Sequence, residues 1–565
     1  MRAVILDGYS DEPAGLGVPP YLDVYPRYVA GAIWEAEKGA EILYFTVDAV
    51  RDSIDKFVEV ANKSDLVVFL AGVLVPGKYL GGDPIKPEEI KLWSSLIERP
   101  VKVLGGPVAR FGMGIEGGTL AVPPEELGEH FDVIAKGDVE VVVHELVREG
   151  LSVERVDPSA LREGYELVDR FAVRGAALVT QHPNYGLNLI VELETYRGCP
   201  RYVVGGCSFC VEPLYGEVVF RSIEGVLAEV EALHRFGVRN FRVGRQSDLY
   251  AYMAKDTGWL EFPRPNPDAI ERLFRGIRSV APDLEVLHID NVNPGTVYHY
   301  PEEAKLISKI IIEYHTPGDV AAFGVESADP RVVELNNLKV MPDEAFEAVR
   351  ILNEVGAIRG WNGLPELLPG INLVHGLLGE TKETFVLNYQ FLKEILDSGL
   401  MVRRINIRQV LPIPGTKMWE VGDRIIAKHR RLFRAYRDKI RREIDVPMLR
   451  RVVPKGTVLR RVFTELHQGK RTLARQVGTY PLLVQVPMKV ELRKFMDFVV
   501  VSHSYRSVTG IPYPLSVNRA PPKVLGMVPG MNRELVRRLL LARPVASRKQ
   551  LEEIVGPGPA KYLVP

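Results

Sequence analysis

Residues 194–210 read Glu-Thr-Tyr-Arg-Gly-Cys-Pro-Arg-Tyr-Val-Val-Gly-Gly-Cys-Ser-Phe-Cys and contain all three cysteines of the 565-residue chain, Cys199, Cys207 and Cys210. A small, clustered set of cysteines favours a metal or redox site over a disulfide framework. A structural zinc site normally takes four ligands, and the chain has no fourth cysteine. A cubane cluster held by three thiolates leaves one iron open instead. The sequence therefore predicts one [4Fe-4S] cluster on these cysteines.

Two alternatives for the cysteines stay open. The first is a zinc site with three cysteines and one histidine, in which His182 or His234 supplies the fourth ligand. The second is a set of buried cysteines without a metal, which their clustering disfavours.

The cysteine segment directly follows the first of six predicted strands. These strands lie near residues 189–193, 240–243, 285–289, 321–325, 370–375 and 405–410, and helical patterns fill the gaps between them. Strands that alternate with amphipathic helices predict a parallel sheet, and six such units predict a partial (β/α)6 barrel over residues 189–420. Active sites of such barrels lie at the carboxyl ends of the strands, where the cysteines fall.

The cysteine segment resembles the loop of the radical SAM superfamily, usually C-x₃-C-x₂-C with an aromatic residue before the last cysteine. Phe209 holds that aromatic place, whereas the spacing here is C-x₇-C-x₂-C. Residues 323–332, 374–381 and 409–416 resemble later segments of the same family. The resemblance implies that S-adenosylmethionine binds the open iron through its amino and carboxylate groups. One electron then cleaves it to a 5′-deoxyadenosyl radical.

The same resemblance implies which residues contact S-adenosylmethionine. Glu326 and Ser327 belong to a Gly-Val-Glu-Ser segment, and Gly376 belongs to the turn that packs near the adenine. Where members often have Gly-Gly-Glu after the second strand, residues 243–248 stand here instead. The predicted cofactor-binding residues are Phe209, Gly244, Gln246, Glu326, Ser327 and Gly376.

Polar residues also follow the third strand of the predicted barrel. His288, Asp290 and Asn291 are the candidate catalytic residues, which would position the substrate or carry protons. A hydrogen-bonded network that only supports the barrel accounts for them equally well.

Residues 1–150 alternate apolar strands with helical patterns, which predicts a doubly wound parallel sheet; residues 151–188 form a connector. This part resembles the cobalamin-binding domain that precedes many radical SAM cores. The motif that supplies a lower histidine ligand to cobalt is absent, since the only histidines in residues 1–150 are His130 and His144. Because cobalamin can bind without that ligand, the resemblance still makes it a candidate cofactor. A domain that only supports the core or binds substrate is the alternative.

The chain has no net charge, yet its two parts differ strongly. Residues 423–565 carry 30 of the 72 Lys and Arg residues but only 10 of the 72 Asp and Glu residues, a net charge of +20. A polyanionic partner would account for this asymmetry, and attraction between the two parts of the chain is the alternative.

The basic part has three predicted segments. We predict a basic helical linker at residues 421–452 and a small β-barrel at residues 453–512. Residues 513–565 are expected to form short helices joined by Pro-Gly turns. The β segment resembles a TRAM domain, a small RNA-binding barrel, and the last segment resembles a helix-hairpin-helix unit. The predicted nucleic-acid contacts are Lys470, Arg471, Arg475, Arg506 and Gly530. Protein docking is the alternative for the helical segment.

These parts together resemble an archaeal-type radical SAM family. The expected function is modification of RNA (tRNA or rRNA) by a reaction of the methyltransferase type, with an electron-donor protein as a further partner. Thiomethylation is disfavoured, because it normally needs three more cysteines for a second cluster. Two alternatives are a cobalamin-dependent radical methylase of a small molecule or peptide, and a non-catalytic iron–sulfur protein that binds nucleic acid. The sequence has no signal peptide or membrane-spanning run, so we expect a cytoplasmic protein.

Overall fold

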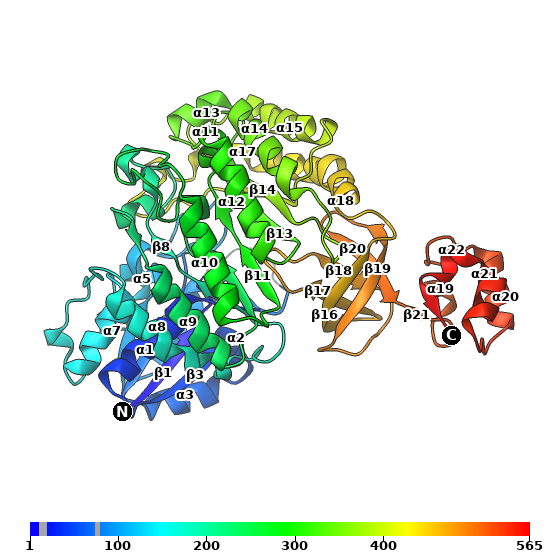
Figure 1. Ribbon diagram of the computed structural model, residues 1–565. Coiled ribbons are helices and arrows are strands. Elements are labelled where there is room, and N and C mark those ends of the chain that lie inside the picture. The colour runs from blue at the N-terminus through cyan, green and yellow to red at the C-terminus, as the bar shows by residue number, and fades with distance from the viewer. Residues whose placement is uncertain (11–19, 74–79) are drawn as a thin grey trace.

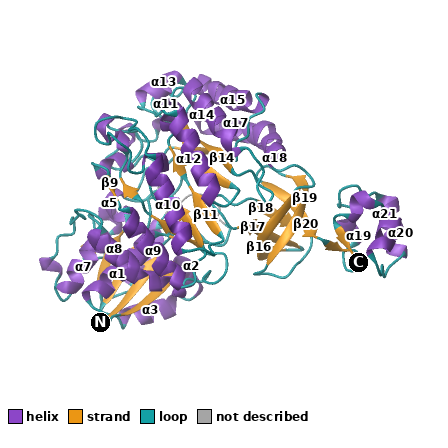
Figure 2. Ribbon diagram, in the orientation of Figure 1, coloured by secondary structure: helices purple, strands orange, loops and turns teal. Residues whose placement is uncertain are grey.

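The computed structural model describes residues 1–10, 20–73 and 80–565. The predicted α/β class is confirmed, because two parallel-sheet units are followed by a small closed β-barrel and a group of short helices (Figures 1 and 2). In Figure 1 the N-terminal sheet is blue, the central barrel green, the small barrel orange, and the outlying C-terminal helices red. No helix in the described part of the chain has the length and apolar character that crossing a membrane requires.

The N-terminal sheet has five parallel strands in the order β3-β1-β4-β5-β6. Ala3 and Ile5 pack in the hydrophobic cluster that includes residues of helices α1 and α7. Val4 and Leu6 pack on the other face in a cluster with residues of α3 and α4. Successive strand residues point to opposite faces, so both faces of this sheet are covered and the doubly wound prediction is confirmed. The bounds are β1 Arg2–Asp7, β3 Glu41–Thr46, β4 Leu66–Leu70, β5 Val101–Gly105, β6 Val133–Ile134, α1 Val24–Ala36, α2 Val47–Asp52, α3 Ile54–Asn62, α4 Pro87–Ser95, α5 Pro107–Phe111, α6 Pro124–Leu127, α7 Val139–Arg148 and, in the connector, α8 Glu166–Gly175.

The central barrel consists of six parallel strand units, as predicted. The third unit is interrupted at Asp290, so it appears as β11 and β12. The bounds are β7 Ile190–Leu193, β10 Asn240–Val243, β11 Val286–Ile289, β12 Asn291–Val292, β13 Asp319–Glu326, β14 Leu367–His375 and β15 Arg404–Gln409. The helices around them are α9 Ile223–Arg235, α10 Pro267–Val280, α11 Pro294–His299, α12 Pro301–Tyr314, α13 Pro330–Leu335, α14 Pro342–Gly356, α15 Lys382–Asp397 and α16 Lys417–Val421.

One strand of this barrel comes from the N-terminal part of the chain, which the sequence did not predict. Strand β2 (Tyr21–Leu22) pairs in parallel with β7, so that Tyr21 lies opposite Ile190. The N-terminal unit therefore extends the open edge of the partial barrel.

Five strands close the small barrel in the order β16-β17-β18-β20-β19, and β18 and β20 are parallel. This is the five-stranded Greek-key arrangement of the OB-fold. The bounds are β16 Val458–Gln468, β17 Arg471–Gln476, β18 Leu483–Val486, β19 Phe495–His503 and β20 Ser507–Tyr513.

Helices lie before and after the small barrel. The predicted basic helix at residues 421–446 is α17 (Arg424–Ile440), which passes through a wider turn at 441–445 into α18 (Val446–Val452). Beyond the barrel, Leu515–Ser516 (β21) pairs with Leu563–Val564 (β22) around four short helices. These are α19 Pro522–Leu525, α20 Arg533–Leu541, α21 Arg548–Val555 and α22 Pro557–Ala560. Their identity as a helix-hairpin-helix unit stays a prediction.

Candidate active site

The cysteine loop begins just beyond β7 and returns on itself between its first two cysteines. After Cys199 a short 3₁₀ helix (Pro200–Val204) ends at Gly205 and Gly206, whose φ angles are +81° and +66°. A Cβ atom at Gly206 would lie 2.1 Å from Pro213 Cγ, so only glycine allows the chain to turn here. Cys207 and Cys210 then share a tight turn, in which Cys210 N donates to Cys207 O at 3.1 Å.

The segment after α13 holds this loop in place. Asn336 Oδ1 accepts from Ser208 Oγ at 2.7 Å, and Asn336 Nδ2 donates to Leu378 O at 2.8 Å. Asn337 Nδ2 donates to Val204 O and Gly206 O at 2.9 and 2.8 Å. The loop is therefore fixed from a strand connection more than a hundred residues away in sequence, between β13 and β14.

The three thiols are free and lie close enough to influence one another. Burial raises the pKa of Cys199 to about 11, and the neighbouring Cys207 thiol adds to the rise. Burial likewise raises the pKa of Cys210, with Cys207 as the next cause. Three neighbouring thiolates with little access to water repel one another unless positive charge lies among them, and an iron–sulfur core supplies that charge. The donor set therefore fits a [4Fe-4S] cluster.

A single zinc ion does not fit the same residues. In the described ranges, no three His, Cys, Asp or Glu side chains lie close enough to hold one metal ion. The two histidines proposed as zinc ligands have other partners: His182 lies beside the ring of Tyr44 in the N-terminal unit, and His234 pairs with Asp283. A cubane cluster separates its thiolate ligands more widely than one ion does.

Two cations lie near the cysteines, the buried Arg201 and the partly buried Lys339. Arg201 Nη1 lies 3.0 Å from Cys207 Sγ. Burial alone would lower the pKa of Lys339, but Cys207 and Glu326 raise it above its usual value. The ammonium of Lys339 lies 3.3 Å from Gly324 O and 3.5 Å from Glu326 Oε1. Neither cation was predicted from the sequence, because neither belongs to a family motif.

The strand-end candidates for S-adenosylmethionine lie at the same mouth. Glu326 ends β13 in a buried position with a φ of +66°, which is rare for a residue with a side chain. The buried Ser327 follows it directly. Gly376 has a φ of +92°, and its N–H donates to Glu380 Oε2 at 2.8 Å. Phe209 packs in the hydrophobic cluster that contains Cys207. These residues could bind and orient a ligand beside the cysteines.

Gly244, Gln246 and Asn291 form a second group after β10 and β11. Gln246 Oε1 accepts from Thr195 Oγ1 at 3.0 Å, and its backbone oxygen accepts from Asn291 Nδ2 at 3.3 Å. A Cβ atom at Gly244 would lie 2.3 Å from Arg242 Nε. Gln246 thus already ties two loops together, so its predicted contact with the cofactor stays a prediction.

His288 has both ring nitrogens engaged by the protein. Its Nδ1 accepts from Thr479 N at 2.8 Å, while Nε2 lies 2.9 Å from Thr316 O. Since Nδ1 accepts, the ring is neutral with its hydrogen on Nε2. Burial lowers the pKa of His288 accordingly. These contacts favour the supporting role for His288 over proton transfer.

Asp290 belongs to a buried charge network inside the barrel. Arg242 Nη2 donates to Asp290 Oδ2 at 2.6 Å, and Arg242 Nε lies 3.3 Å from Glu192 Oε2. Burial raises the pKa of Asp290, while Arg242 and the hydroxyl of Tyr480 oppose the rise. Arg404 lies over the Tyr480 ring at 4.1 Å. Tyr480 comes from the small barrel, so the predicted RNA-binding module supplies part of the interior of the central barrel.

The predicted nucleic-acid residues divide into two groups. Lys470, Arg471 and Gly530 lie on the surface. Arg475 instead pairs with Glu465 at 2.6 Å and donates to Leu80 O, and Arg506 donates to Ile405 O at 3.2 Å. The last two arginines therefore join parts of the chain in this structure.

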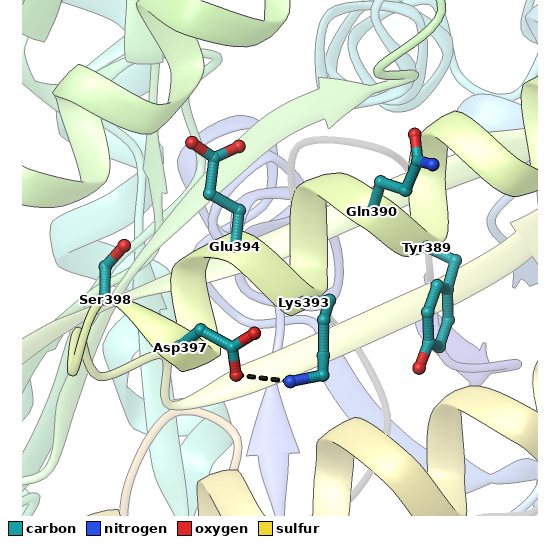
Figure 3. A pocket seen from close by; sticks show the side chains of 6 residues that line it. All are labelled: Tyr389, Gln390, Lys393, Glu394, Asp397 and Ser398. Carbon is teal, nitrogen blue, oxygen red and sulfur yellow. Dashed lines mark hydrogen bonds and ion pairs between the residues drawn. The ribbon is translucent and has the colours of Figure 1, made fainter.

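A surface depression of about 540 Å³ lies along the C-terminal half of α15, and none of the cysteines lines it. Figure 3 shows its lining, in which Lys393 pairs with Asp397 on one face of the helix. All of its lining residues come from 389–398, and none comes from the cysteine loop or the strand ends. It is therefore not a candidate active site.

The sequence profile of the Radical SAM superfamily matches residues 193–392. An uncharacterized protein of Methanocaldococcus jannaschii is 46% identical over 515 residues, which are 90% of this chain and 93% of the relative. The ribosomal protein uS12 methylthiotransferase RimO of Vibrio cholerae is 24% identical over 271 residues, 47% of this chain and 53% of the relative. Among solved structures, the radical S-adenosylmethionine methyltransferase TsrM of Kitasatospora setae is 16% identical with a TM-score of 0.47, covering 74% of each chain.

Proposed function

Because the chain belongs to the radical SAM superfamily, we propose that it is an RNA methylase that holds its [4Fe-4S] cluster on Cys199, Cys207 and Cys210. When bound, this cluster supplies the electron that cleaves S-adenosylmethionine, and a protein electron donor renews it. Radical chemistry suits methylation of an unreactive carbon, since such a C–H bond has no acidic proton for a general base. Sulfur insertion is disfavoured, because no cysteine remains for a second cluster.

The residues at the mouth have separate tasks in this proposal. Glu326, Ser327 and Gly376 bind and orient S-adenosylmethionine at the strand ends. The partly buried ammonium of Lys339 lies beside Glu326 and balances its charge. Phe209 and the apolar cluster around Cys207 keep water from the loop.

The position of helix α17 carries the RNA part of the proposal. Its inner residue Ile426 packs in the cluster that contains Cys207, and a Cβ atom at Gly376 would lie 2.4 Å from Ile426 Cγ1. On the same helix, His429 Nδ1 lies 2.9 Å from Glu380 Oε1, and Glu380 also binds His375 at the end of β14. The inner face of α17 is therefore part of the barrel mouth.

The outer face of α17 is strongly basic. The helix contains seven Lys and Arg residues and one Asp. Lys428, Arg431 and Arg434 are exposed and form no ion pair within the described part of the chain. Unpaired cations at such a site attract the phosphates of a nucleic acid. An RNA that lies on this face is brought to the edge of the radical site.

Exposed cations elsewhere in the basic part support the same partner. Lys470 and Arg471 lie at the turn between β16 and β17, where OB-folds bind oligonucleotides. In the C-terminal helical group Gly530 is exposed. The exposed cations of this group are Lys523, Arg533, Arg537, Arg538, Arg548, Lys549 and Lys561.

Crosslinking tests this proposal. The full-length protein is purified without oxygen, crosslinked to cellular RNA, and the bound RNA is sequenced. A variant with Lys428→Glu, Arg431→Glu and Arg434→Glu is compared with a control that reverses three exposed lysines elsewhere, Lys38, Lys91 and Lys309. We expect enrichment of specific tRNA or rRNA species that the α17 variant loses and the control keeps. Wild-type protein that enriches no RNA would contradict the RNA proposal, and equal recovery from the wild type and the α17 variant would remove α17 from the interface.

Product analysis tests the catalytic part separately. The reduced protein with S-adenosylmethionine should release 5′-deoxyadenosine or methionine, and a Cys207→Ala variant should not. Reduced wild type that holds a cluster but forms neither product would favour a non-catalytic iron–sulfur protein.

A second candidate is a cobalamin-dependent methylase of a small molecule or peptide. The turn at residues 112–122, beyond β5, bonds to the end of β15, since Gly118 N donates to Val410 O at 3.0 Å and Ala121 N to Pro412 O at 3.1 Å. The carboxyl edge of the N-terminal sheet thus faces the barrel mouth, where a cofactor on that edge would meet the cysteine loop. His144 packs on Phe171, so it is not free to serve as a ligand to cobalt. A shift in the cobalamin spectrum on titration with reduced protein would support this candidate, and no shift would exclude it.

A further inference from the structure

We propose that Arg201 sets the reduction potential of the cluster by donating a hydrogen bond to one of its thiolate ligands. The inference rests on the cluster part of the proposed function and not on the RNA part. Arg201 lies within the unusually long spacing between Cys199 and Cys207. Its Nη1 lies 3.0 Å from Cys207 Sγ, within donor distance for sulfur.

The guanidinium of Arg201 is held on every side. Nε donates to Glu261 Oε1 at 2.9 Å, and Nη2 donates to Asn337 O at 2.9 Å. The ring of Phe262 lies 6.0 Å from the guanidinium carbon. Arg201 is only 1% exposed. A planar group with its other donors engaged cannot rotate away, so the remaining donor is fixed on the sulfur.

Such a contact acts on the two oxidation states unequally. The reduced cluster carries one more negative charge than the oxidised cluster. A buried cation and an N–H donor at the sulfur stabilise the more negative state more strongly. The contact therefore raises the reduction potential and eases electron transfer from the donor protein.

The local chain shows why the spacing is long. Arg201 lies in the 3₁₀ turn Pro200–Val204. The chain then reverses direction at Gly205 and Gly206, which have positive φ angles, so that Cys207 comes close to Arg201. Asn337 binds both Arg201 and the backbone of this turn. The extra residues thus bring a cation to one of the cluster ligands.

Potentiometry of the reconstituted full-length protein tests the inference. The wild type, Arg201→Met, Arg201→Lys and Glu261→Gln are loaded without oxygen, and iron and sulfide per chain are measured first. Each is then titrated with dithionite while electron paramagnetic resonance follows the reduced cluster. We expect a more negative midpoint in Arg201→Met and a smaller shift in Arg201→Lys, which keeps the charge. Glu261→Gln should shift the midpoint to less negative values, because it removes an opposing charge.

An unchanged midpoint in Arg201→Met with a full cluster would overturn the inference. Iron and sulfide content of the wild type separates this result from a failure of the cluster assignment.

A spectroscopic measurement covers the case in which Arg201→Met does not fold. Protein labelled with ¹⁵N-arginine is reduced and studied by pulsed electron paramagnetic resonance. The wild type should show a weak nitrogen coupling that Arg201→Lys loses. The control Arg264→Lys should keep it, because Arg264 pairs with Glu303 on the surface. A reduced wild-type cluster without this coupling would overturn the inference.

Discussion

Arg242 lies at the centre of the barrel between two buried carboxyl groups, Glu192 and Asp290. All three side chains are at most 3% exposed. A buried ion network is costly to form, but removal of one partner is worse, because it leaves charge without compensation. This network, rather than a hydrophobic layer, fills the middle of the barrel.

We predict that Arg242→Met destabilises the protein by about 3–5 kcal/mol, because both carboxyl groups lose their cation. Thermal or denaturant unfolding measures the loss. The combined variant Arg242→Met, Glu192→Gln, Asp290→Asn should recover a large part of it. Equal stability of Arg242→Met and the wild type would show that the network does not matter for folding.

His288 makes the stability of the fold depend on pH. Its pKa is lowered in the folded state by burial, whereas an unfolded histidine titrates near about 6.5. Below that pH the unfolded chain binds a proton that the folded His288 does not, so stability falls as the pH falls. We predict that His288→Gln loses less stability than the wild type between pH 7.5 and 5.5, as measured by urea unfolding. Parallel pH profiles of the two proteins would contradict this assignment.

At the scale of elements, the cysteine loop depends on the turn that follows α13. Ser208 N donates to Asn336 O at 3.0 Å, and Asn336 Oδ1 also accepts from Leu378 N at 3.2 Å. The loop, α13 and the end of β14 therefore meet at one amide side chain. A radical site needs this rigidity, because its ligands must be held in place before the cluster enters.

Asn336→Ala removes several buried hydrogen bonds at once. We predict a loss of about 2–4 kcal/mol in stability and a lower iron content after reconstitution. Asn353→Ala is the matched control. Asn353 lies on α14, away from the cysteine loop, and its Oδ1 likewise accepts a hydrogen bond from a backbone N–H, that of Met401, at 2.8 Å. A variant at Asn336 that takes up iron like the control would contradict the role of this turn.

At the scale of the whole molecule, three parts of the chain meet in the central barrel. Tyr21 of β2 donates its hydroxyl hydrogen to Gly478 O at 2.6 Å, and Thr479 binds His288. The turn at residues 478–480 thus lies between the N-terminal strand and the barrel. The turn therefore connects the small barrel to the central barrel.

Gly478 allows that close approach, since a Cβ atom there would lie 2.5 Å from His288 Cε1. We predict that Gly478→Val costs about 1–3 kcal/mol and loosens the small barrel from the core. Hydrogen exchange should show faster exchange of residues 478–480 in the variant. Gly558→Val is a control at an exposed position without a positive φ, where a Cβ atom would meet no atom within 4 Å. Equal exchange in both variants would argue against a docked turn.

The basic surface predicts a strong salt dependence of RNA binding. Each phosphate contact contributes about 0.7 to the slope of log K against log salt for a single strand. We predict that the Lys428→Glu, Arg431→Glu, Arg434→Glu variant lowers the slope by about 2 for a fluorescein-labelled tRNA transcript. Fluorescence anisotropy measures the slope, and the control is a variant in which the charges of Lys38, Lys91 and Lys309 are reversed by substitution with glutamate. Slopes that do not differ would remove α17 from the interface.

Local patterns identified most of the fold. The strands near 240–243, 370–375 and 405–410 are β10, β14 and β15, because apolar runs between turn residues reflect burial in a parallel sheet. The helical pattern over residues 51–62 is divided at Ser53 into α2 and α3, because Ser53 leaves the helical conformation. Strand β2 was missed, since two residues carry no periodicity and pair only through a partner 169 positions away.

Three cysteines in one loop, six βα units and a basic C-terminal part are all visible in the amino-acid sequence. These features are local, so composition and spacing reveal them. Which cations lie near the thiols and how the parts of the chain join depend instead on how the chain packs in three dimensions. Asn337 holds Arg201 beside Cys207, α17 borders the mouth, and Tyr480 enters the barrel, because segments distant in sequence pack together. No local pattern records such contacts, since each depends on the backbone path of both partners.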